Sequence, residues 1–146
     1  MAVQPIPDGY HTITPYIIVP NAAGFIEFAK KAFDAIVKER MDGPGGSIMH
    51  AELRIGNSIM MLSDPLRDPT LRPGHIYLYV DDTDETYNKA IAAGAESLLE
   101  PADQFYGDRN AGVKDVFGNT WWIATHVEEV SREEMARRME AAAAKG

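Results

Sequence analysis

Hydrophobic and polar positions follow the same order twice along this chain. Between residues 12 and 62, an alternating segment rich in β-branched residues comes first, then apolar residues at helical spacing, then further strand-like segments. Residues 75–124 repeat that order, and Gly56 and Gly118 occupy the same place in the closing segments. A repeat of this kind predicts two copies of one β-α-β-β-β unit.

In the first copy, turn residues and helical periodicity set the boundaries. The step Pro20-Asn21 ends the first strand, and Gly56-Asn57 marks a turn between the last two. A glycine-rich loop follows the second strand, because glycine adopts backbone conformations that other residues avoid. The expected elements are a strand over 12–19, a helix over 22–33, a strand over 36–41, and a hairpin of strands over 48–55 and 58–62.

The second copy is followed by a C-terminal helix. The acidic run 81–84 supplies a capping oxygen before the helical segment of this copy, and Gly94 ends that segment. Ser131 and Glu134 form a capping-box pattern at the start of the last helix. The expected elements are a strand over 76–80, a helix over 85–93, a strand over 97–100, a long loop over 101–110, a hairpin of strands over 112–116 and 120–124, and a helix over 135–145.

These elements predict an α+β fold in a single domain. At 146 residues and 45% hydrophobic content, the chain is long enough to bury one core. The predicted subdivision is a first module over 12–63, a linker over 64–74, a second module over 75–126, and a C-terminal helix within 127–146. The linker is rich in proline and charged residues, which suits an exposed connection.

Composition argues against several classes of function. The formal net charge is -8, which repels nucleic-acid phosphates and anionic membrane surfaces, so neither is an expected partner. The chain has no cysteine, so a metal site would have to use histidine and carboxylate ligands. No apolar run approaches the roughly 18 residues that span a bilayer. We therefore expect a cytoplasmic protein without disulfides.

Several segments of the chain resemble one known superfamily. They are ITPYIIV at 13–19, MHAELRIG at 49–56, and QFYGDR at 104–109 leading to DVFGNTW at 115–121. Together with the paired units, they are similar to the vicinal-oxygen-chelate superfamily of glyoxalase I, extradiol dioxygenases and bleomycin-resistance proteins, and most of all to its PhnB-like branch. The resemblance implies that each unit curls into a half-barrel sheet, that two units enclose a cavity, and that the protein forms a homodimer.

In the metalloenzymes of this superfamily, side chains from the first and last strands of each unit hold a divalent metal. The resemblance places Thr14 and His75 at the first-strand positions, and Met60 or Met61 and Trp122 at the last-strand positions. Methionine and tryptophan cannot replace a hard oxygen donor, so only His75 of this set is retained. We therefore expect no metal or other cofactor.

An alternative metal site uses His50, Glu52 and His75. Residues two apart on a strand share a face, so the imidazole of His50 and the carboxylate of Glu52 could converge with His75 on a divalent metal. The competing structural interpretation is a salt bridge between Glu52 and Arg54, with His75 hydrogen-bonded to the backbone. The sequence assigns no catalytic residue.

Aromatic residues are expected to line the cavity. Tyr16, Tyr77 and Trp122 fall on predicted strands, and Phe105 falls in the long loop. Such a lining would hold an apolar or planar ligand by burial and stacking. The expected ligand-binding residues are Tyr16, His50, Glu52, His75, Tyr77, Phe105, Arg109 and Trp122.

Arg109 is the residue expected to meet an anionic group on such a ligand. It follows Gly107 in the predicted loop, and a guanidinium pairs well with carboxylates and phosphates. The competing interpretation is an ion pair with Asp103 or Asp108.

The sequence is compatible with two functions. The first is a small-molecule-binding protein of the bleomycin-resistance type, whose aromatic cavity sequesters a ligand without a metal. The second is a metal-dependent lyase, isomerase or dioxygenase that uses His50, Glu52 and His75 to polarise its substrate through the metal. The loss of the usual metal ligands favours the first function.

Overall fold

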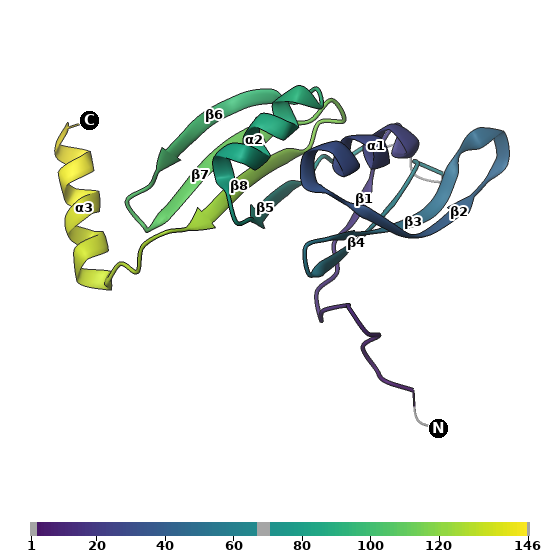
Figure 1. The fold of residues 1–146 in the computed structure, drawn as a ribbon, viewed down its shortest axis with the longest axis horizontal. Helices are drawn as coiled ribbons and strands as arrows, with labels where there is room; N and C mark the ends of the chain where they lie inside the picture. Colours follow the sequence, from purple (N-terminus) through teal and green to yellow (C-terminus); the bar gives the residue numbers. More distant parts are fainter. Residues whose placement is uncertain (1–2, 67–70, 146) are drawn as a thin grey trace.

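The computed structural model describes residues 3–66 and 71–145, and its elements follow the predicted repeat (Figure 1). The first module contains β1 (Tyr16–Ile18), α1 (Ala22–Phe33), β2 (Ile36–Asp42), the short helix η1 (Pro44–Gly46), β3 (Ile48–Ile55) and β4 (Ser58–Ser63). The second module contains β5 (His75–Tyr79), α2 (Thr83–Ala92), β6 (Glu96–Asp103), β7 (Asp108–Lys114) and β8 (Thr120–His126). Helix α3 (Arg132–Lys145) follows. The predicted α+β fold is confirmed.

Each module forms one four-stranded mixed sheet. The strand order is β1-β4-β3-β2 in the first sheet and β5-β8-β7-β6 in the second. In both sheets the first strand pairs in parallel with the fourth, and the other pairs are antiparallel. Within the described residues, no strand of one sheet pairs with a strand of the other, so both sheets stay open. Helices α1 and α2 lie on the same side of the two sheets and pack against each other (Figure 1).

Helix α1 forms at its predicted position because both ends are capped and one face is apolar. The side chain of Asn21 accepts a hydrogen bond from the backbone N–H of Gly24 at 3.0 Å. Asp34 ends the helix in the left-handed conformation. Its carboxylate also accepts from the Nζ of Lys89 on α2 at 2.8 Å, which links the two modules.

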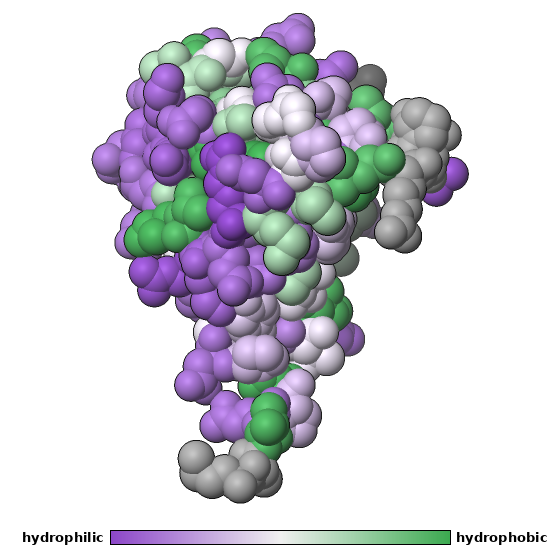
Figure 2. All heavy atoms as spheres, turned by 90° about the vertical axis from the view of Figure 1, so that its right-hand side faces the viewer, coloured by the Kyte–Doolittle hydropathy of each residue, from purple (hydrophilic) through white to green (hydrophobic). Residues whose placement is uncertain are grey.

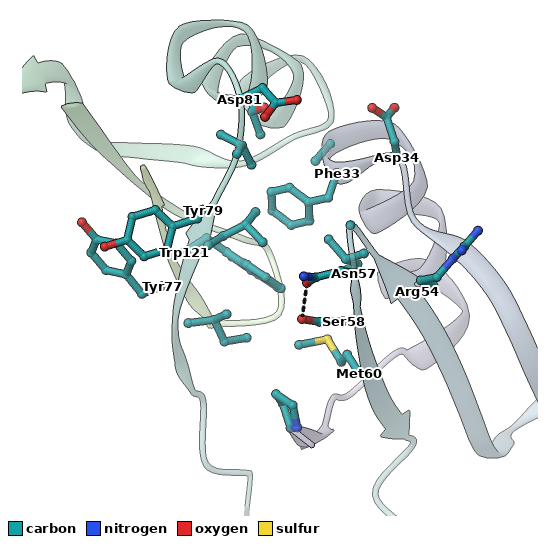
Figure 3. Close-up of a pocket in the computed structure, with 18 of the residues that line it drawn as sticks. Phe33, Asp34, Arg54, Asn57, Ser58, Met60, Tyr77, Tyr79, Asp81 and Trp121 are labelled. Atoms are coloured by element: carbon teal, nitrogen blue, oxygen red, sulfur yellow. Dashed lines mark hydrogen bonds between the residues drawn. The ribbon is translucent and has the colours of Figure 1, made fainter. Parts of the chain in front are cut away.

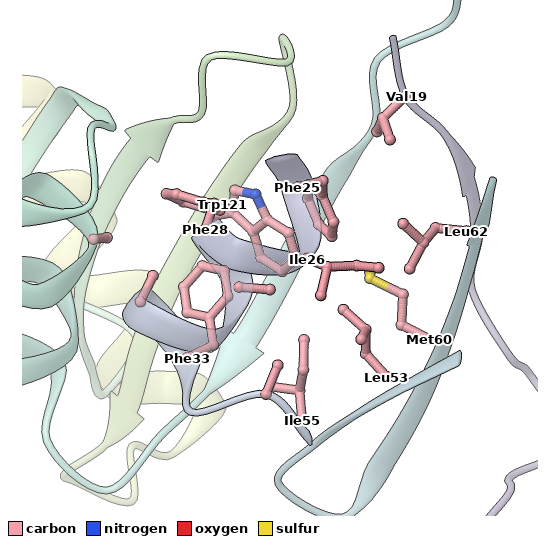
Figure 4. Close-up of a cluster of buried hydrophobic side chains, with 14 of the residues drawn as sticks. Val19, Phe25, Ile26, Phe28, Phe33, Leu53, Ile55, Met60, Leu62 and Trp121 are labelled. Atoms are coloured by element: carbon pink, nitrogen blue, oxygen red, sulfur yellow. The ribbon is translucent and has the colours of Figure 1, made fainter. Parts of the chain in front are cut away.

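The indole of Trp121 joins the two modules. Trp121 lies on β8 of the second module and is 0% exposed. Its ring packs against Phe25 and Phe33 of α1, with ring centroids 6.1 and 4.4 Å away (Figure 4). The two modules therefore share one hydrophobic core.

Asp115 fixes the turn that precedes Trp121. One carboxylate oxygen accepts from the backbone N–H groups of Phe117 and Asn119, both at 2.9 Å. The other accepts from the side-chain amide of Asn119 at 3.2 Å and from the indole N–H of Trp121 at 2.9 Å. Gly118 adopts a φ of 95° in this turn, which side chains other than glycine rarely tolerate. The segment DVFGNTW thus has a structural role.

The long loop predicted over 101–110 is wrong. Strands β6 and β7 extend into this segment and leave only a short hairpin tip, Gln104–Gly107. Pro101 suggested a loop because proline has no N–H to donate, but β6 is an edge strand and its register is irregular there. Arg109 therefore lies on a strand and not in a loop.

Of the two hydrogen bonds in the capping box predicted for the C-terminal helix, only the one to Ser131 is present in the described residues. The hydroxyl of Ser131 accepts from the backbone N–H of Glu134 at 3.1 Å. The carboxylate of Glu134 instead pairs with Arg137 and Arg138. Helix α3 begins at Arg132, directly after the predicted cap Ser131, and none of its described residues is buried.

Hydrophilic side chains cover most of the surface at the end of the first module, where the N-terminal arm projects from the body (Figure 2).

Strand β1 is shorter than the strand predicted over 12–19, because the hydroxyl of Thr14 donates back to the carbonyl of His11 at 3.2 Å in a local turn. Of the linker predicted over 64–74, residues 67–70 lie outside the described residues. In the described part of the chain, no helix is long and apolar enough to cross a membrane.

Replacing Trp121 by alanine is expected to destabilise both modules together. The variant loses a fully buried indole and its packing against α1, a change that costs about 3–5 kcal/mol. Trp122→Ala is the matched control, because this neighbouring tryptophan lies on the other face of β8 and is only partly buried. Urea denaturation followed by circular dichroism measures the free energy of unfolding of each variant. Equal losses would contradict the role given to Trp121.

Candidate functional site

Each sheet has a free face, the one not covered by α1 or α2, and most of the predicted site residues lie there. Side chains alternate along a strand, so the neighbours of core residues point to the free face. In the first module, the free face carries Tyr16, His50, Glu52 and Met61. In the second module, it carries His75, Tyr77, Tyr79, Asp108, Asn110, Gly112 and Trp122.

On the free face of the first module, Glu52 is held by its neighbours. The residue is 5% exposed, accepts a hydrogen bond from the hydroxyl of Tyr10, and lies 2.8 Å from Nε2 of His50. The Nζ of Lys38 donates to the hydroxyl of Tyr10 at 2.7 Å. Burial raises the pKa of Glu52, but the bonds from Tyr10 and His50 outweigh it and the net shift is downward. Glu52 is therefore ionised at neutral pH.

An N-terminal arm brings Tyr10 to this face. The arm and the sheet border an open pocket of about 400 Å³, with Glu52 and Met61 on the sheet side and Ile6 among the residues of the arm. The contact between Tyr10 and Glu52 joins segments far apart in the sequence. No local pattern around Tyr10 predicts it, so sequence analysis missed this residue.

On the free face of the second module, Tyr77, Tyr79 and His126 contact the carboxylate of Asp108. We call these four residues the Asp108 cluster. The hydroxyls of Tyr77 and Tyr79 donate to one oxygen at 2.6 and 3.1 Å, and Nδ1 of His126 lies 2.9 Å from the other. Asp108 is buried, which raises its pKa, but the bonds from Tyr77, His126 and Tyr79 shift it downward overall. Burial and this same carboxylate raise the pKa of Tyr77. The cluster therefore holds an ionised Asp108 and a protonated Tyr77.

Asn110 links the Asp108 cluster to the hairpin tip. Its Nδ2 donates to the hydroxyl of Tyr106 at 2.6 Å and to that of Tyr77 at 3.4 Å. Phe105 packs edge-on against Tyr106, with ring centroids 5.1 Å apart. Nη1 of Arg138 donates to the carbonyl of Phe105 at 3.1 Å, so α3 holds the tip from outside.

Trp122 packs over Gly112 of the neighbouring strand. A Cβ atom at Gly112 would lie 2.5 Å from the indole ring, so a larger residue there would displace the ring. Trp122 is also the register partner of Tyr77 on β5. Tyr77, Tyr79 and Trp122 form one aromatic surface on the free face of the second module, and it carries two of the predicted ligand-binding residues.

The strand register places the metal-ligand positions that the resemblance implied. Tyr16 pairs with Met61, and Tyr77 pairs with Trp122. Met61 is therefore the counterpart of Trp122, whereas Met60 faces the core. The four positions hold Thr14, Met61, His75 and Trp122, which offer one imidazole and no carboxylate. This donor set does not fit a divalent metal.

The alternative metal set is brought together only in part. His50 and Glu52 are in contact, whereas His75 is exposed at the start of β5 in the other module. Among residues 3–66 and 71–145, no group of three or more histidine, aspartate or glutamate side chains is placed to hold a metal ion. The salt bridge considered between Glu52 and Arg54 does not form in this part of the chain, because His50 and Tyr10 take the carboxylate oxygens.

Arg109 lies on the helix-covered face of its sheet, opposite Asp108. Its guanidinium binds Asp84 of α2 at 2.7 and 3.0 Å and Asp103 at 3.2 Å. The ion pair with Asp103 is thus present, whereas Asp108 points to the other face. These carboxylates raise the pKa of Arg109. The ion pair between Arg109 and Asp84 stabilises the contact of α2 with the sheet. The guanidinium of Arg109 therefore does not face the aromatic surface.

A cavity of about 1090 Å³ lies between the two modules (Figure 3). Phe33 and Trp121 line its inner end, and β5 and the turn between β3 and β4 line its sides. Tyr77 and Tyr79 border this cavity, but their rings lie on the side of β5 turned away from Trp121 (Figure 3). Strand β5 therefore separates the cavity from the aromatic surface.

Solved structures of other proteins share this fold. The structure of TioX from Micromonospora sp. ML1 has a TM-score of 0.69 and 22% sequence identity, covering 80% of this chain and 99% of that one. The structure of protein PA1353 from Pseudomonas aeruginosa has a TM-score of 0.65 and 22% identity, covering 81% of this chain and 99% of that one. At such identities the similarity concerns the fold alone.

Sequence comparison gives the family. The uncharacterized protein Mb0911c of Mycobacterium bovis is 36% identical over 138 residues, covering 87% of this chain and 91% of that protein. The uncharacterized protein Rv0887c of Mycobacterium tuberculosis is also 36% identical over 138 residues, covering 87% of this chain and 81% of that protein. The family profile matches residues 9–123. The chain therefore belongs to the Glyoxalase/Bleomycin resistance protein/Dioxygenase superfamily.

Proposed function

We propose that this protein binds a planar, largely apolar small molecule on the free faces of its sheets, without a metal. The observation that carries the proposal is the aromatic surface of the second module. Tyr77 and Tyr79 have ring centroids 5.2 Å apart, and Tyr79 is 63% exposed. Such rings stack on a planar ligand and bury a large apolar area. The donor set at the metal positions supports the same conclusion.

The Asp108 cluster prepares this surface for binding. Both tyrosine hydroxyls donate to the same buried carboxylate, which limits the rotation of both side chains. Gly112 leaves room for the indole of Trp122 to lie flat beside them. Rings that are ordered before the ligand arrives lose less conformational entropy on binding, so more of the contact energy appears as affinity.

We further propose that the protein is a homodimer in which a second copy covers the free faces. Tyr16, Ile18 and Tyr77 leave apolar surface exposed on both open sheets. A partner that applies its first module to the second module of its mate would enclose a cavity between the two free faces. We also propose that the chain belongs to the PhnB-like branch, because the segment MHAELRIG at 49–56 carries that resemblance.

A metal-dependent lyase, isomerase or dioxygenase is the second candidate function. The observation that favours it is the contact between His50 and Glu52, with Nε2 and Oε2 2.8 Å apart on a free face. With His75, these side chains would supply two imidazoles and one carboxylate to a divalent metal, which would act as a Lewis acid.

Metal analysis separates the two candidate functions. We expect protein purified without chelators to carry far less than one equivalent of zinc, manganese, iron or nickel, because the inherited donor set holds one imidazole. Inductively coupled plasma mass spectrometry measures the ratio of metal to chain. A ratio near one that falls in both His50→Ala and Glu52→Ala would support the enzyme and contradict the metal-free proposal.

The aromatic surface is expected to bind 1-aminoanthracene, a neutral planar fluorophore. Trp122→Ala should weaken this binding about tenfold, because it removes a stacking partner and its buried area. Val116→Ala is the control, because Val116 is apolar and 73% exposed but lies in the turn between β7 and β8. Fluorescence titration gives both affinities. Unchanged affinity in Trp122→Ala would remove the main support for the proposal.

The homodimer predicts a solution mass near twice the chain mass of 16.1 kDa. Sedimentation equilibrium at micromolar concentration measures this mass. Tyr79→Asp should shift the protein toward monomers, because it places a charge on an apolar surface that the partner covers. A wild-type protein that is monomeric under these conditions would rule out the dimer proposal.

A further inference from the structure

The side chain of Asn110, whose Nδ2 contacts Tyr77 of the aromatic surface, carries an unsatisfied oxygen. Asn110 is 4% exposed, and its Oδ1 is buried without a hydrogen-bond partner among the described residues. A buried carbonyl oxygen without a partner is costly, so such atoms usually meet a donor in the functional state of a protein.

The neighbours of Asn110 fix which way its amide points. The hydroxyl of Tyr77 donates its hydrogen bond to the ionised Asp108 at 2.6 Å, so towards Asn110 it can only accept. The hydroxyl of Tyr106 lies 2.6 Å from the same amide nitrogen. The two N–H groups of the amide therefore serve the two hydroxyls, and Oδ1 is left as the free acceptor. Tyr106 accepts in this arrangement, so its own proton is available as a donor.

We propose that Asn110 is the polar anchor of the ligand, and that the ligand is a planar ring system containing a lactam. This inference rests on the binding function proposed above. The lactam N–H donates to Oδ1 of Asn110, the adjacent carbonyl accepts from the hydroxyl of Tyr106, and the ring lies against the aromatic surface. A lactam matches the site because it carries one donor and one acceptor side by side.

A cationic ligand fits the second module less well than a neutral one. The carboxylate of Asp108 already accepts from Tyr77, Tyr79 and His126, so little of its capacity is left for a ligand cation. The free acceptor is a neutral amide oxygen. The chemistry of the site therefore selects a neutral N–H donor.

The ligand reaches Oδ1 by displacing Phe105 and Tyr106 of the hairpin tip. These two residues are attached by polar contacts, from Asn110 to Tyr106 and from Arg138 to the carbonyl of Phe105. The base of the tip stays in place, because the carbonyl of Gly107 accepts from the backbone N–H groups of Val127 and Glu128 at 2.9 and 3.1 Å. Phe105 is itself 37% exposed, so an outward shift of the tip uncovers little buried apolar surface. As Tyr106 moves outward, its hydroxyl leaves the amide of Asn110 and donates to the carbonyl of the bound lactam.

The test compares two probes of the same shape, isoquinolin-1(2H)-one and isocoumarin, in which a ring oxygen replaces the N–H. Isothermal titration calorimetry on the full chain should show that the wild type prefers the lactam about tenfold, the worth of one buried hydrogen bond. In Asn110→Ala the preference should fall below about twofold. Tyr106→Phe should weaken the binding of both probes to the same extent, because both carry the carbonyl that accepts from Tyr106. The preference for the lactam should therefore remain.

Asn110→Ser is measured in parallel, with circular dichroism on each variant, so that a folding defect in Asn110→Ala does not decide the result. Its hydroxyl is too short to replace the amide oxygen, so the preference should be lost here as well. Equal affinities of the wild type for the two probes would overturn this inference and leave the binding function standing. A preference that persists in both Asn110 variants would also overturn it. If the wild type bound neither probe while it bound 1-aminoanthracene, only the lactam would be refuted; failure to bind all three would refute both proposals.

Discussion

The packing of Trp121 against α1 is the interaction on which the rest of this structure depends. The indole belongs to the second module, but Phe25 and Phe33 of the first module surround it. Its N–H is held by Asp115, whose carboxylate also closes the turn before β8. This buried side chain, together with the packing of α1 against α2, thus sets where the two modules meet. Because that junction lies on the helix side, the free faces of the sheets are turned away from the shared core.

The alternation of side chains along β8 connects this core to the proposed site. Trp121 points into the core and contributes to stability, whereas the next residue, Trp122, points to the free face and is proposed to contact the ligand. By the same alternation, Asp108 and Asn110 lie on the free face beside the tyrosines, whereas Arg109 lies on the covered face and contacts α2. Substitutions on the free face should therefore change binding more than folding, and those on the covered face should do the reverse.

Local patterns predicted most of the fold. Helix α1 and strand β3 lie at their predicted bounds, because the apolar spacing and the flanking turn residues agree. Local patterns did not predict that strands β6 and β7 extend into residues 101–110. Proline fits into β6 only because β6 is an edge strand of its sheet. Edge position is a property of the whole sheet and leaves no mark on the local sequence.

The candidate site was predicted less completely, for a related reason. Tyr77 and Trp122 were found because aromatic residues on strands are visible in the sequence. Tyr10 and Asn110 were missed, because their roles arise from contacts with residues on other segments or from an unmet hydrogen bond. Arg109 was assigned to the ligand because its partner on α2 is far away in the sequence.

The central claim is that Trp122 faces the ligand and Trp121 does not. The chain contains two tryptophans, so Trp121→Phe and Trp122→Phe each leave a single indole N–H resonance in the proton NMR spectrum. Titration with 1-aminoanthracene should shift the resonance of Trp122 strongly in Trp121→Phe, since the ring current of a stacked ligand acts at contact distance. The shift of the Trp121 resonance in Trp122→Phe should be clearly smaller, because that indole is buried on the other side of the sheet. Equal shifts in both variants, or a larger shift of Trp121, would place the ligand elsewhere and contradict this account.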